Sequence, residues 1–509
     1  MRKNQQTILI TGASGFIGSY LVGRVRDNYN IYVLSRRRPR TFDYVSDPKI
    51  KWIQADIGST SGLKEALKNI NSTFPVDFII HLAGFYDFNY DHNPEYERTN
   101  VKGTKNILEE AKKLKIKRFI FASSVAACDF PRKNNERITE KTPADAKFDY
   151  AISKRKGEEM VTEYSKHFNC TVVRFAAAFS DWCEYGPLYI FLNTWLNRNW
   201  KSRILGGKGK SAIPYIHIHC LINLLVEVME RTEELPKIDT YIASGSNSVS
   251  HEELFDLSTR FFYGESKKPI HMPKLISFMG LVGMDLIGRL FDKRPFERPW
   301  MIRYVDKQMV VDNSYTREQL NWYPTKRFVL PRRLLFMIEH MKSYPFEWQK
   351  RNALAMKLRK VSPNFMIYET LDRLRDKIIK KCVDYILADE NIDQFPNYHT
   401  LERTSLIKDT RTLYQFLSVA VRAKDRMSTI LYAREIAHIR EKQNFKLEEI
   451  LYAVQVIGNI IQEELVQEES LKGMSHEIYD EINFTFQLVL DEIEGTFEVI
   501  RRHKEFKTS

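Results

Sequence analysis

Short apolar runs alternate with amphipathic stretches through the first third of the chain. Five runs rich in branched and aromatic residues predict buried parallel strands, at residues 7–11, 31–34, 51–55, 77–83 and 118–123. Apolar positions at helical spacing predict helices between them, at residues 16–25, 63–70 and 94–114. Because strand and helix alternate, we expect an α/β fold, a doubly wound parallel sheet with a small substrate lobe.

The pattern changes near residue 345. Only three of the 21 glycines lie beyond it, and no proline follows Pro396. Long amphipathic patterns predict helices at residues 352–360, 368–388, 411–421, 426–442, 447–468 and 478–501. We therefore predict two domains, an α/β domain over residues 1–345 and a separate all-α domain over residues 346–509.

The turn after the first predicted strand, TGASGFIG, carries a chemical signal. Gly12 permits a tight turn, Gly15 lets backbone N–H groups approach a phosphate, and Gly18 lets the helix lie close to the strand. Free N–H groups at a helix start bind the pyrophosphate of a dinucleotide. Strand, glycines and helix follow in the required order, so we predict a dinucleotide site in a Rossmann-type sheet.

The residue that ends the second strand bears on cofactor choice. An acid there would bond the ribose 2′-hydroxyl of NAD, but the chain has Ser35 followed by Arg36, Arg37 and Arg38. Guanidinium groups grip a phosphate through paired hydrogen bonds, so we expect NADP(H) to be preferred, with NAD(H) as the second option. The less favoured alternative is that these arginines only form a solvated loop. Asp56 lies where an acid can bond the adenine amine.

Two segments place acid–base groups near the predicted sheet edge. Ser123 and Ser124 end the fifth strand, where open α/β sheets bind their ligands. In the segment YAISK, Tyr150 and Lys154 lie one helical turn apart. A nearby ammonium lowers the pKa of a tyrosine, which can then exchange a proton with a substrate oxygen while hydride moves to or from nicotinamide. Ser124 would hold that same oxygen.

These motifs, with HLAG, NVKGT and the FASS strand end, resemble the extended short-chain dehydrogenases/reductases over roughly residues 5–345. That family includes nucleotide-sugar epimerases and dehydratases, 3β-hydroxysteroid dehydrogenases and dihydroflavonol reductases. The resemblance implies that Tyr150 is the general acid/base, Lys154 its modulator and ribose ligand, and Ser124 the partner of the substrate oxygen. The implied cofactor contacts are Gly12, Ser14, Gly15, Phe16, Ile17, Gly18, Arg36, Arg37, Asp56, Ile57, Leu82, Ala83, Gly84, Tyr150 and Lys154.

Three departures from this pattern concern the substrate. Sugar-nucleotide members carry an asparagine soon after an arginine in the next strand, the sixth, whereas here Arg174 is followed by FAAA. Those members also carry Val-Tyr-Gly after the catalytic serine, where this chain has ACD at residues 127–129. The apolar segment 273–291 stands where those members have a polar sugar-binding lobe. With its basic flank, the stretch 273–298 could cap an apolar pocket, contact a membrane surface peripherally or be an ordinary packed helix.

Composition and charge bear on the partners and the cell compartment of the protein. The formal net charge is +13, but the basic residues are scattered among acids, so we expect a solvated surface and no nucleic-acid partner. Five cysteines without a Cys-x-x-Cys pair suit a reduced cytoplasm and predict no metal site or disulfide framework. The sequence has no uncharged run of 18 residues, so we expect no membrane-spanning helix. We expect a cytoplasmic protein that acts on a small molecule.

Residues 434–465 are similar to the N-terminal helical sensor domain of stressosome RsbR-type proteins, a globin-like fold without haem in its known members. The similarity implies regulation or dimerisation through helices, so we expect a homo-oligomer. Three functions remain open. The first is an NADP(H)-dependent oxidoreductase that acts on an alcohol or ketone, which can be apolar or lipid-like. The second is a nucleotide-sugar epimerase or dehydratase. The third is a dinucleotide-binding redox sensor or scaffold.

Overall fold

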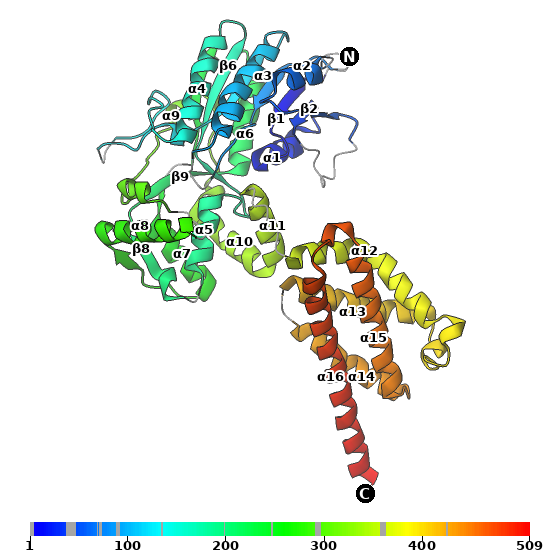
Figure 1. The fold of residues 1–509 in the computed structure, drawn as a ribbon. Helices are drawn as coiled ribbons and strands as arrows, with labels where there is room; N and C mark the ends of the chain where they lie inside the picture. Colours follow the sequence, from blue (N-terminus) through cyan, green and yellow to red (C-terminus); the bar gives the residue numbers. More distant parts are fainter. Residues whose placement is uncertain are drawn as a thin grey trace. The chain divides into compact units, whose positions relative to one another are not determined.

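The computed structural model describes residues 5–36, 47–68, 70, 74–87, 92–133, 136–197, 199–245, 248–290, 297–356, 363–423 and 426–508. The chain forms two compact units (Figure 1). The first comprises Met1–Tyr344 with Leu354–Met356, and the second comprises Pro345–Ala353 with Lys357–Ser509.

Seven parallel strands form the central sheet of the first unit, in the order β10-β6-β5-β4-β1-β2-β3. Their bounds are β1 Thr7–Thr11, β2 Asn30–Ser35, β3 Ile50–Gln54, β4 Phe78–His81, β5 Arg118–Ser124, β6 Asn169–Phe175 and β10 Ile238–Ala243. The strand order runs outward from β1 to β3, then returns to β4 on the other side of β1. This reversal makes the gap between β1 and β4 the switch point of a doubly wound sheet, which confirms the predicted fold class.

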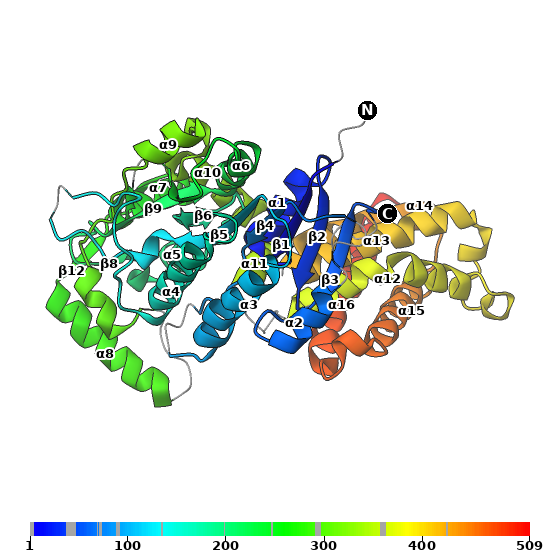
Figure 2. The same ribbon diagram turned by 90° about the horizontal axis from the view of Figure 1, so that it is seen from above.

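Alternate residues of β1 enter different cores because side chains of a strand point to opposite faces. Ile8 and Ile10 belong to a core that includes residues of α1 (Phe16–Val25) and α6 (Ile218–Glu230). Leu9 belongs to a second core, built with α2 (Thr60–Leu67), α3 (Gly103–Ala111) and α4 (Asp149–Tyr164). The sheet is therefore covered by helices on both faces, as Figures 1 and 2 show.

The predicted helix over residues 94–114 differs from the observed one. It begins as a π-helix, Tyr96–Lys102, and continues as α3. The wider turn occurs where Asn100 bonds the backbone of Phe85 on a neighbouring loop, a long-range contact that local periodicity does not reveal. The fourth strand is also shorter than predicted, ending at His81.

The substrate lobe contains two small sheets and several helices. One sheet has the order β11-β9-β7, with bounds Ser248–Ser250, Ala212–His217 and Ala177–Phe179. The other pairs β12 (Ile270–Met272) with β8 (Ile204–Gly206). The helices are α5 (Gly186–Trp195), α7 (His251–Tyr263), α8 (Lys274–Leu290) and α10 (Leu330–Ser343). The predicted helical segment 273–291 is thus confirmed as α8.

The second unit is all-helical, as the sequence predicts. Its helices are α11 Pro345–Ala355, α12 Pro363–Ile386, α13 Arg403–Ala423, α14 Met427–Lys442, α15 Leu447–Val466 and α16 Ser475–Thr508. Apolar residues of α12 to α16 meet in one core that includes Ile378, Leu417 and Ile461. Whether this unit has the globin-like sensor fold stays a prediction. Among the described residues of the whole chain, no helix is long and apolar enough to cross a membrane.

Candidate active site at the carboxyl edge of the sheet

The turn between β1 and α1 is shaped by glycines at two close approaches. Gly12 has a φ of +73°, and a Cβ there would lie 2.7 Å from the backbone N of Ala83. A Cβ on Gly18 would lie 2.5 Å from the carbonyl oxygen of Gly12, so helix and turn touch backbone to backbone. At Gly15 a Cβ would approach only that same oxygen, at 3.3 Å. The turn is thus the compact, Cβ-free cradle that a pyrophosphate requires.

The start of α1 is suited to an anion. Its N-cap residue is Gly15, which has no side chain that could cap the first N–H groups, and its first turn carries no acid. Backbone N–H groups of a first helical turn lack intrahelical partners and attract negative charge. Ser14, Phe16 and Ile17 lie in this segment, so the predicted pyrophosphate contacts share one turn of chain. The residues present fit a bound dinucleotide.

Hydrogen bonds join the ends of β1 and β4. The hydroxyl of Thr11 accepts from the N–H of Ala83 at 3.1 Å and contacts Nδ1 of His81 at 2.8 Å. Nε2 of His81 lies 3.0 Å from the hydroxyl of Thr104 on α3. Burial, with the charge of Lys154 as a second cause, lowers the pKa of His81 to about 3, so the ring is neutral. These hydrogen bonds fix the segment Leu82, Ala83 and Gly84 beside the glycine turn.

Lys154 and Tyr150 lie together on the first two turns of α4. The Nζ of Lys154 donates to the carbonyl oxygen of Ala122 at 2.8 Å and lies 5.7 Å from the centre of the Tyr150 ring. Only 7% of Lys154 is exposed, and burial lowers the pKa of its ammonium to about 8, against the charge of Glu158. The lysine is therefore largely charged at neutral pH, beside the tyrosine that it is predicted to tune.

Ser124 ends β5, two residues after the carbonyl group that holds Lys154. Its hydroxyl accepts from the N–H of Ala126 at 3.1 Å, which caps the short helix Val125–Ala127. Gly84 borders the same region, since a Cβ there would lie 3.5 Å from Nζ of Lys154. The structure thus gathers Ser124, Tyr150, Lys154 and Gly84 at the carboxyl edge of β4 and β5. Their catalytic roles stay predictions.

Asn100 supports this group, a role for which the sequence analysis assigned no residue. Its amide nitrogen donates to the carbonyl oxygen of Phe85 and to the hydroxyl of Ser153, each at 2.9 Å. Its amide oxygen accepts from the N–H of Phe85 at 2.6 Å. Asn100 therefore ties the loop after β4 to α4. An asparagine inside a helical pattern is the sequence signal that could have drawn attention to it.

Asp56 belongs to a network of four charged side chains. One of its oxygens accepts from the N–H of Gly58 at 2.9 Å, and the other accepts from Arg98 at 2.8 Å. Arg98 also bonds both oxygens of Glu95, and Nη1 of Arg36 lies 4.0 Å from Glu95. Burial acts to raise the pKa of Asp56, but the hydrogen bonds from Arg98 and Gly58 and the charges of Arg98 and Arg36 together outweigh it, so the pKa is lowered.

This network changes how the predicted cofactor contacts are understood. The charge of Arg36 is partly balanced by Glu95, so its guanidinium is not simply open to a 2′-phosphate. Arg37 and Arg38 lie outside the described residues. Ile57, next to Asp56, is buried against the Cα of Gly103, where a Cβ would lie 2.8 Å from its side chain.

A nearly buried ion pair holds α4 to β6. Arg174 bonds Glu158 through Nε at 3.0 Å and Nη2 at 2.7 Å, and it donates to the carbonyl oxygen of Thr142 at 2.6 Å. The hydroxyl of Ser123 donates to the same carboxylate at 2.5 Å. Glu158 lies one turn after Lys154, so the pair orients the helix that carries Tyr150 and Lys154. Sequence spacing alone does not identify this partner of Arg174.

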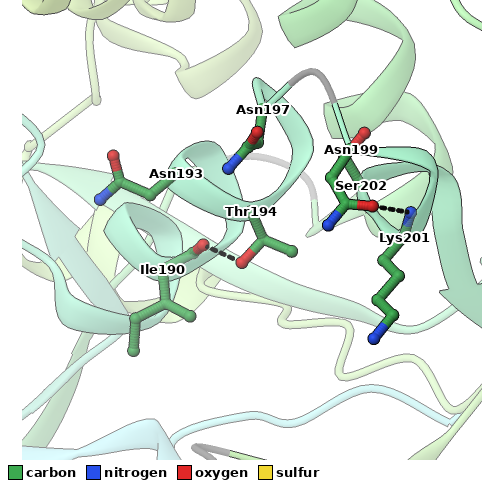
Figure 3. A pocket seen from close by; sticks show the side chains of 7 residues that line it. All are labelled: Ile190, Asn193, Thr194, Asn197, Asn199, Lys201 and Ser202. Atoms are coloured by element: carbon green, nitrogen blue, oxygen red, sulfur yellow. Dashed lines mark hydrogen bonds between the residues drawn. The ribbon is translucent and has the colours of Figure 1, made fainter.

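A surface hollow of about 360 Å³ lies in the substrate lobe, over α5 and the short helix Trp200–Arg203 (Figure 3). The residues around it include three asparagines and Lys201. Two hydrogen bonds shape it: the hydroxyl of Thr194 donates to the carbonyl oxygen of Ile190, and the N–H of Lys201 donates to Asn199. A second hollow, about 710 Å³, lies beside Arg98 and Met160. Neither is lined by a predicted catalytic residue. Among the described residues, no cluster of His, Cys, Asp and Glu could hold a metal ion.

Residues 8–243 match a family described as the NAD dependent epimerase/dehydratase family. The chain is 28% identical over 259 residues to a putative UDP-glucose 4-epimerase of Methanocaldococcus jannaschii, which covers 49% of this chain and 80% of that protein. It is 24% identical over 338 residues to the UDP-glucose 4-epimerase of Vibrio cholerae, and this match covers 64% of this chain and 92% of that protein. The N-terminal 240 or so residues therefore carry the pattern of this enzyme family.

A solved structure agrees in fold. The dTDP-glucose 4,6-dehydratase of Bacillus anthracis, in complex with NAD, superimposes with a TM-score of 0.51 at 18% identity, covering 68% of this chain and 99% of that one. At this identity the likeness establishes the fold alone. The family match ends at residue 243, so the predicted sensor-like nature of the helical unit stays a prediction.

Proposed function

We propose that the first unit is an NAD-dependent enzyme that oxidises a secondary alcohol of its substrate, with Tyr150 as the general acid/base. The observation that carries this proposal is the position of Lys154, buried, charged near neutral pH and held between the carbonyl oxygen of Ala122 and the Tyr150 ring. A cation in that place stabilises the phenolate form of Tyr150. The family match over residues 8–243 supports the same chemistry.

In this mechanism the hydroxyl of Ser124 bonds the substrate oxygen, and Tyr150 removes its proton. A bound dinucleotide supplies the nicotinamide ring that accepts and returns hydride. The cradle formed by Gly12, Gly15 and Gly18 and the start of α1 would hold its pyrophosphate. Asn100, through Phe85 and Ser153, keeps the loop after β4 and the helix of Tyr150 in register.

The relatives favour a redox-neutral outcome. Both curated relatives are named as UDP-glucose 4-epimerases, so we propose that a nucleotide-linked sugar is the first substrate class to test. A net oxidoreductase acting on an apolar alcohol or ketone is the second candidate. It is supported by FAAA after Arg174, where sugar-nucleotide members carry an amide, and by the apolar exposed helix α8.

Product analysis separates the two candidates. Incubation with UDP-glucose or dTDP-glucose and NAD⁺ should give an epimerised or dehydrated sugar without accumulation of NADH. Steady oxidation of NADPH with a hydrophobic ketone, and no change in either sugar, would instead support the oxidoreductase. Tight dinucleotide binding without turnover on either panel would favour the third hypothesis, a redox sensor or scaffold.

A further inference from the structure

Helix α8 presents a broad apolar face to solvent. Seven of its side chains are exposed: Leu275 (70%), Ile276 (50%), Phe278 (41%), Met279 (57%), Met284 (52%), Leu286 (57%) and Ile287 (58%). Single exposed apolar side chains are ordinary on protein surfaces, but a contiguous group on one helix marks an interaction site. These seven residues are called the α8 face below. Their exposure also argues against the interpretation of this segment as an ordinary packed helix.

The polar groups of α8 are arranged around that face. Its one acid, Asp285, is buried and is bonded by Arg289 at 3.0 Å and by Arg298 at 3.4 Å. Lys274 and Arg289, near the two ends, have exposed side chains (53% and 60%), and the Nζ of Lys274 lies 3.9 Å from the less exposed carboxylate of Asp306. The outward surface of the helix therefore carries apolar groups with cations at its ends and no exposed carboxylate of its own.

Basic residues continue beside the start of α8. β12 leads into the helix and pairs with β8, and both lie next to α8 at the margin of the first unit (Figure 2). Residues 199–210, which include β8, carry four basic residues and no acid: Lys201, Arg203, Lys208 and Lys210. All four are exposed, as is Lys268 before β12, whose carbonyl oxygen accepts from Arg203 at 2.8 Å.

We propose that the α8 face docks the protein on the surface of a lipid bilayer that contains anionic lipids. An apolar helical face inserts into the boundary between headgroups and acyl chains, while flanking lysines and arginines attract anionic headgroups. The helix has 17 residues, and among the described residues no helix is long and apolar enough to span a membrane, so α8 would lie in the surface plane.

Charge also argues for a bilayer over a second copy of the chain. A twofold contact places the same patch of two molecules face to face. Here that would bring the basic residues around α8, among them Lys274, Arg289 and those of segment 199–210, close to the basic residues of the second molecule, which like-charge repulsion disfavours. An anionic surface complements both features of the patch at once.

The docked helix would lie close to the catalytic tyrosine. The short helix Pro299–Tyr304 packs on α8, and its Trp300 stacks on Phe148 with ring centres 6.3 Å apart. Phe148 in turn stacks on Tyr150 at 6.4 Å. Docking by α8 stands without the proposed function, but it would present the Tyr150 site to substrates carried at a membrane surface.

The test is sedimentation of the full-length protein with vesicles. We expect binding to vesicles of phosphatidylcholine with 30% phosphatidylglycerol, weaker binding at high salt, and little binding to phosphatidylcholine alone. The variant Leu275→Gln/Met279→Gln should bind at least ~10-fold more weakly, because it loses two apolar side chains that would be buried in the bilayer. The matched control is Met427→Gln/Leu431→Gln, which removes an equally spaced exposed pair (58% and 55%) from α14.

A fluorescent label gives a second readout. All five native cysteines are buried, so Met279→Cys can be labelled selectively with an environment-sensitive dye. Its emission should shift to the blue on anionic vesicles, and a label at Met427→Cys should not. The proposal is overturned by equal vesicle binding of the two double variants, by a wild-type protein that binds no vesicles, or by an α8-dependent dimer that buries the label without lipid.

Discussion

Arg174 and Glu158 form a two-point ion pair whose side chains are only 6% and 12% exposed. The pair links the last strand before the substrate lobe to the helix that carries Tyr150 and Lys154. A buried charge that loses its partner is costly, because the remaining ion has no water to compensate it.

The Glu158→Gln variant should therefore lose about 3 kcal/mol of unfolding free energy, at the lower end of the cost of breaking a buried pair. Urea denaturation followed by circular dichroism measures this. Glu159→Gln is the matched control, since that neighbouring carboxylate is 66% exposed and should contribute less than about 0.5 kcal/mol. Equal midpoints for the two variants would show that the pair does not brace the helix.

Tyr150→Phe should leave dinucleotide binding nearly unchanged while turnover falls by ~10²–10⁴-fold, the usual contribution of a general acid/base. Isothermal titration measures the binding and product analysis the rate. Tyr164→Phe, on the same helix but bonded to Glu109 away from Lys154, should keep its activity. Unchanged kinetics in Tyr150→Phe would remove the tyrosine from the mechanism.

The burial of Lys154 predicts a pH dependence of stability. Its pKa is about 8 in the folded protein against 10.5 for a free side chain, so between these values the unfolded state binds more protons. Stability from this group is lowest below about pH 8 and rises until about pH 10.5, by roughly 3 kcal/mol at 1.36 kcal/mol per pH unit. Lys154→Met lacks this titrating group, so between these pH values the unfolding free energy of wild type should rise relative to that of the variant. Parallel pH profiles would contradict the shift.

Cofactor preference tests the charged network around Arg98. If Arg36 contacts a 2′-phosphate, Arg36→Ala should weaken NADP(H) binding by about 1.5–3 kcal/mol and leave NAD(H) nearly unaffected. Glu95→Gln should strengthen NADP(H) binding, because the carboxylate 4.0 Å from Arg36 is removed. Titration calorimetry with both cofactors measures this, with the exposed Arg26→Ala as control. Equal affinity of the wild-type protein for the two cofactors would reject the NADP preference.

The helical unit is expected to be dispensable for chemistry. A chain ending at residue 356 keeps every residue of the first unit, including all predicted catalytic side chains. We expect it to fold, to bind dinucleotide and to show a smaller oligomer in light scattering. Loss of dinucleotide binding by this folded, shortened chain would mean that the helices belong to the active site.

Local patterns predicted the elements that local forces determine. The bounds of β1 and α1 match the prediction at every residue, because the strand, the glycines and the apolar positions of the helix lie within 19 residues. The α8 segment was predicted as a helix for the same reason. Its exposure could not be predicted, since periodicity identifies an apolar face but not what covers it.

The supporting contacts of the site depend on pairs that are distant in the sequence. Asp56 and Arg98 lie 42 residues apart, and Asn100 reaches Ser153 across 53. Each is fixed by the sheet order, which places the ends of β3, β4 and β5 along one edge. The sequence therefore predicts Tyr150, Lys154 and Ser124 as site residues through their spacing, but it does not reveal the residues that orient them.

The strand order also has a consequence for how the chain folds. β1 pairs with β4 across 70 residues, so the centre of the sheet cannot form until the chain has been synthesised beyond His81. In the helical unit, α12 packs on α13 and α15 on α16, which are chain neighbours, and α14 packs on α16 and α12 on α15 across slightly longer separations. Because contacts distant in sequence slow folding, we expect the helical unit, which is made after the first unit, to reach its native state faster. During synthesis, the apolar strands that will form the sheet therefore remain exposed longest, and this is the stage at which the protein most needs protection from aggregation.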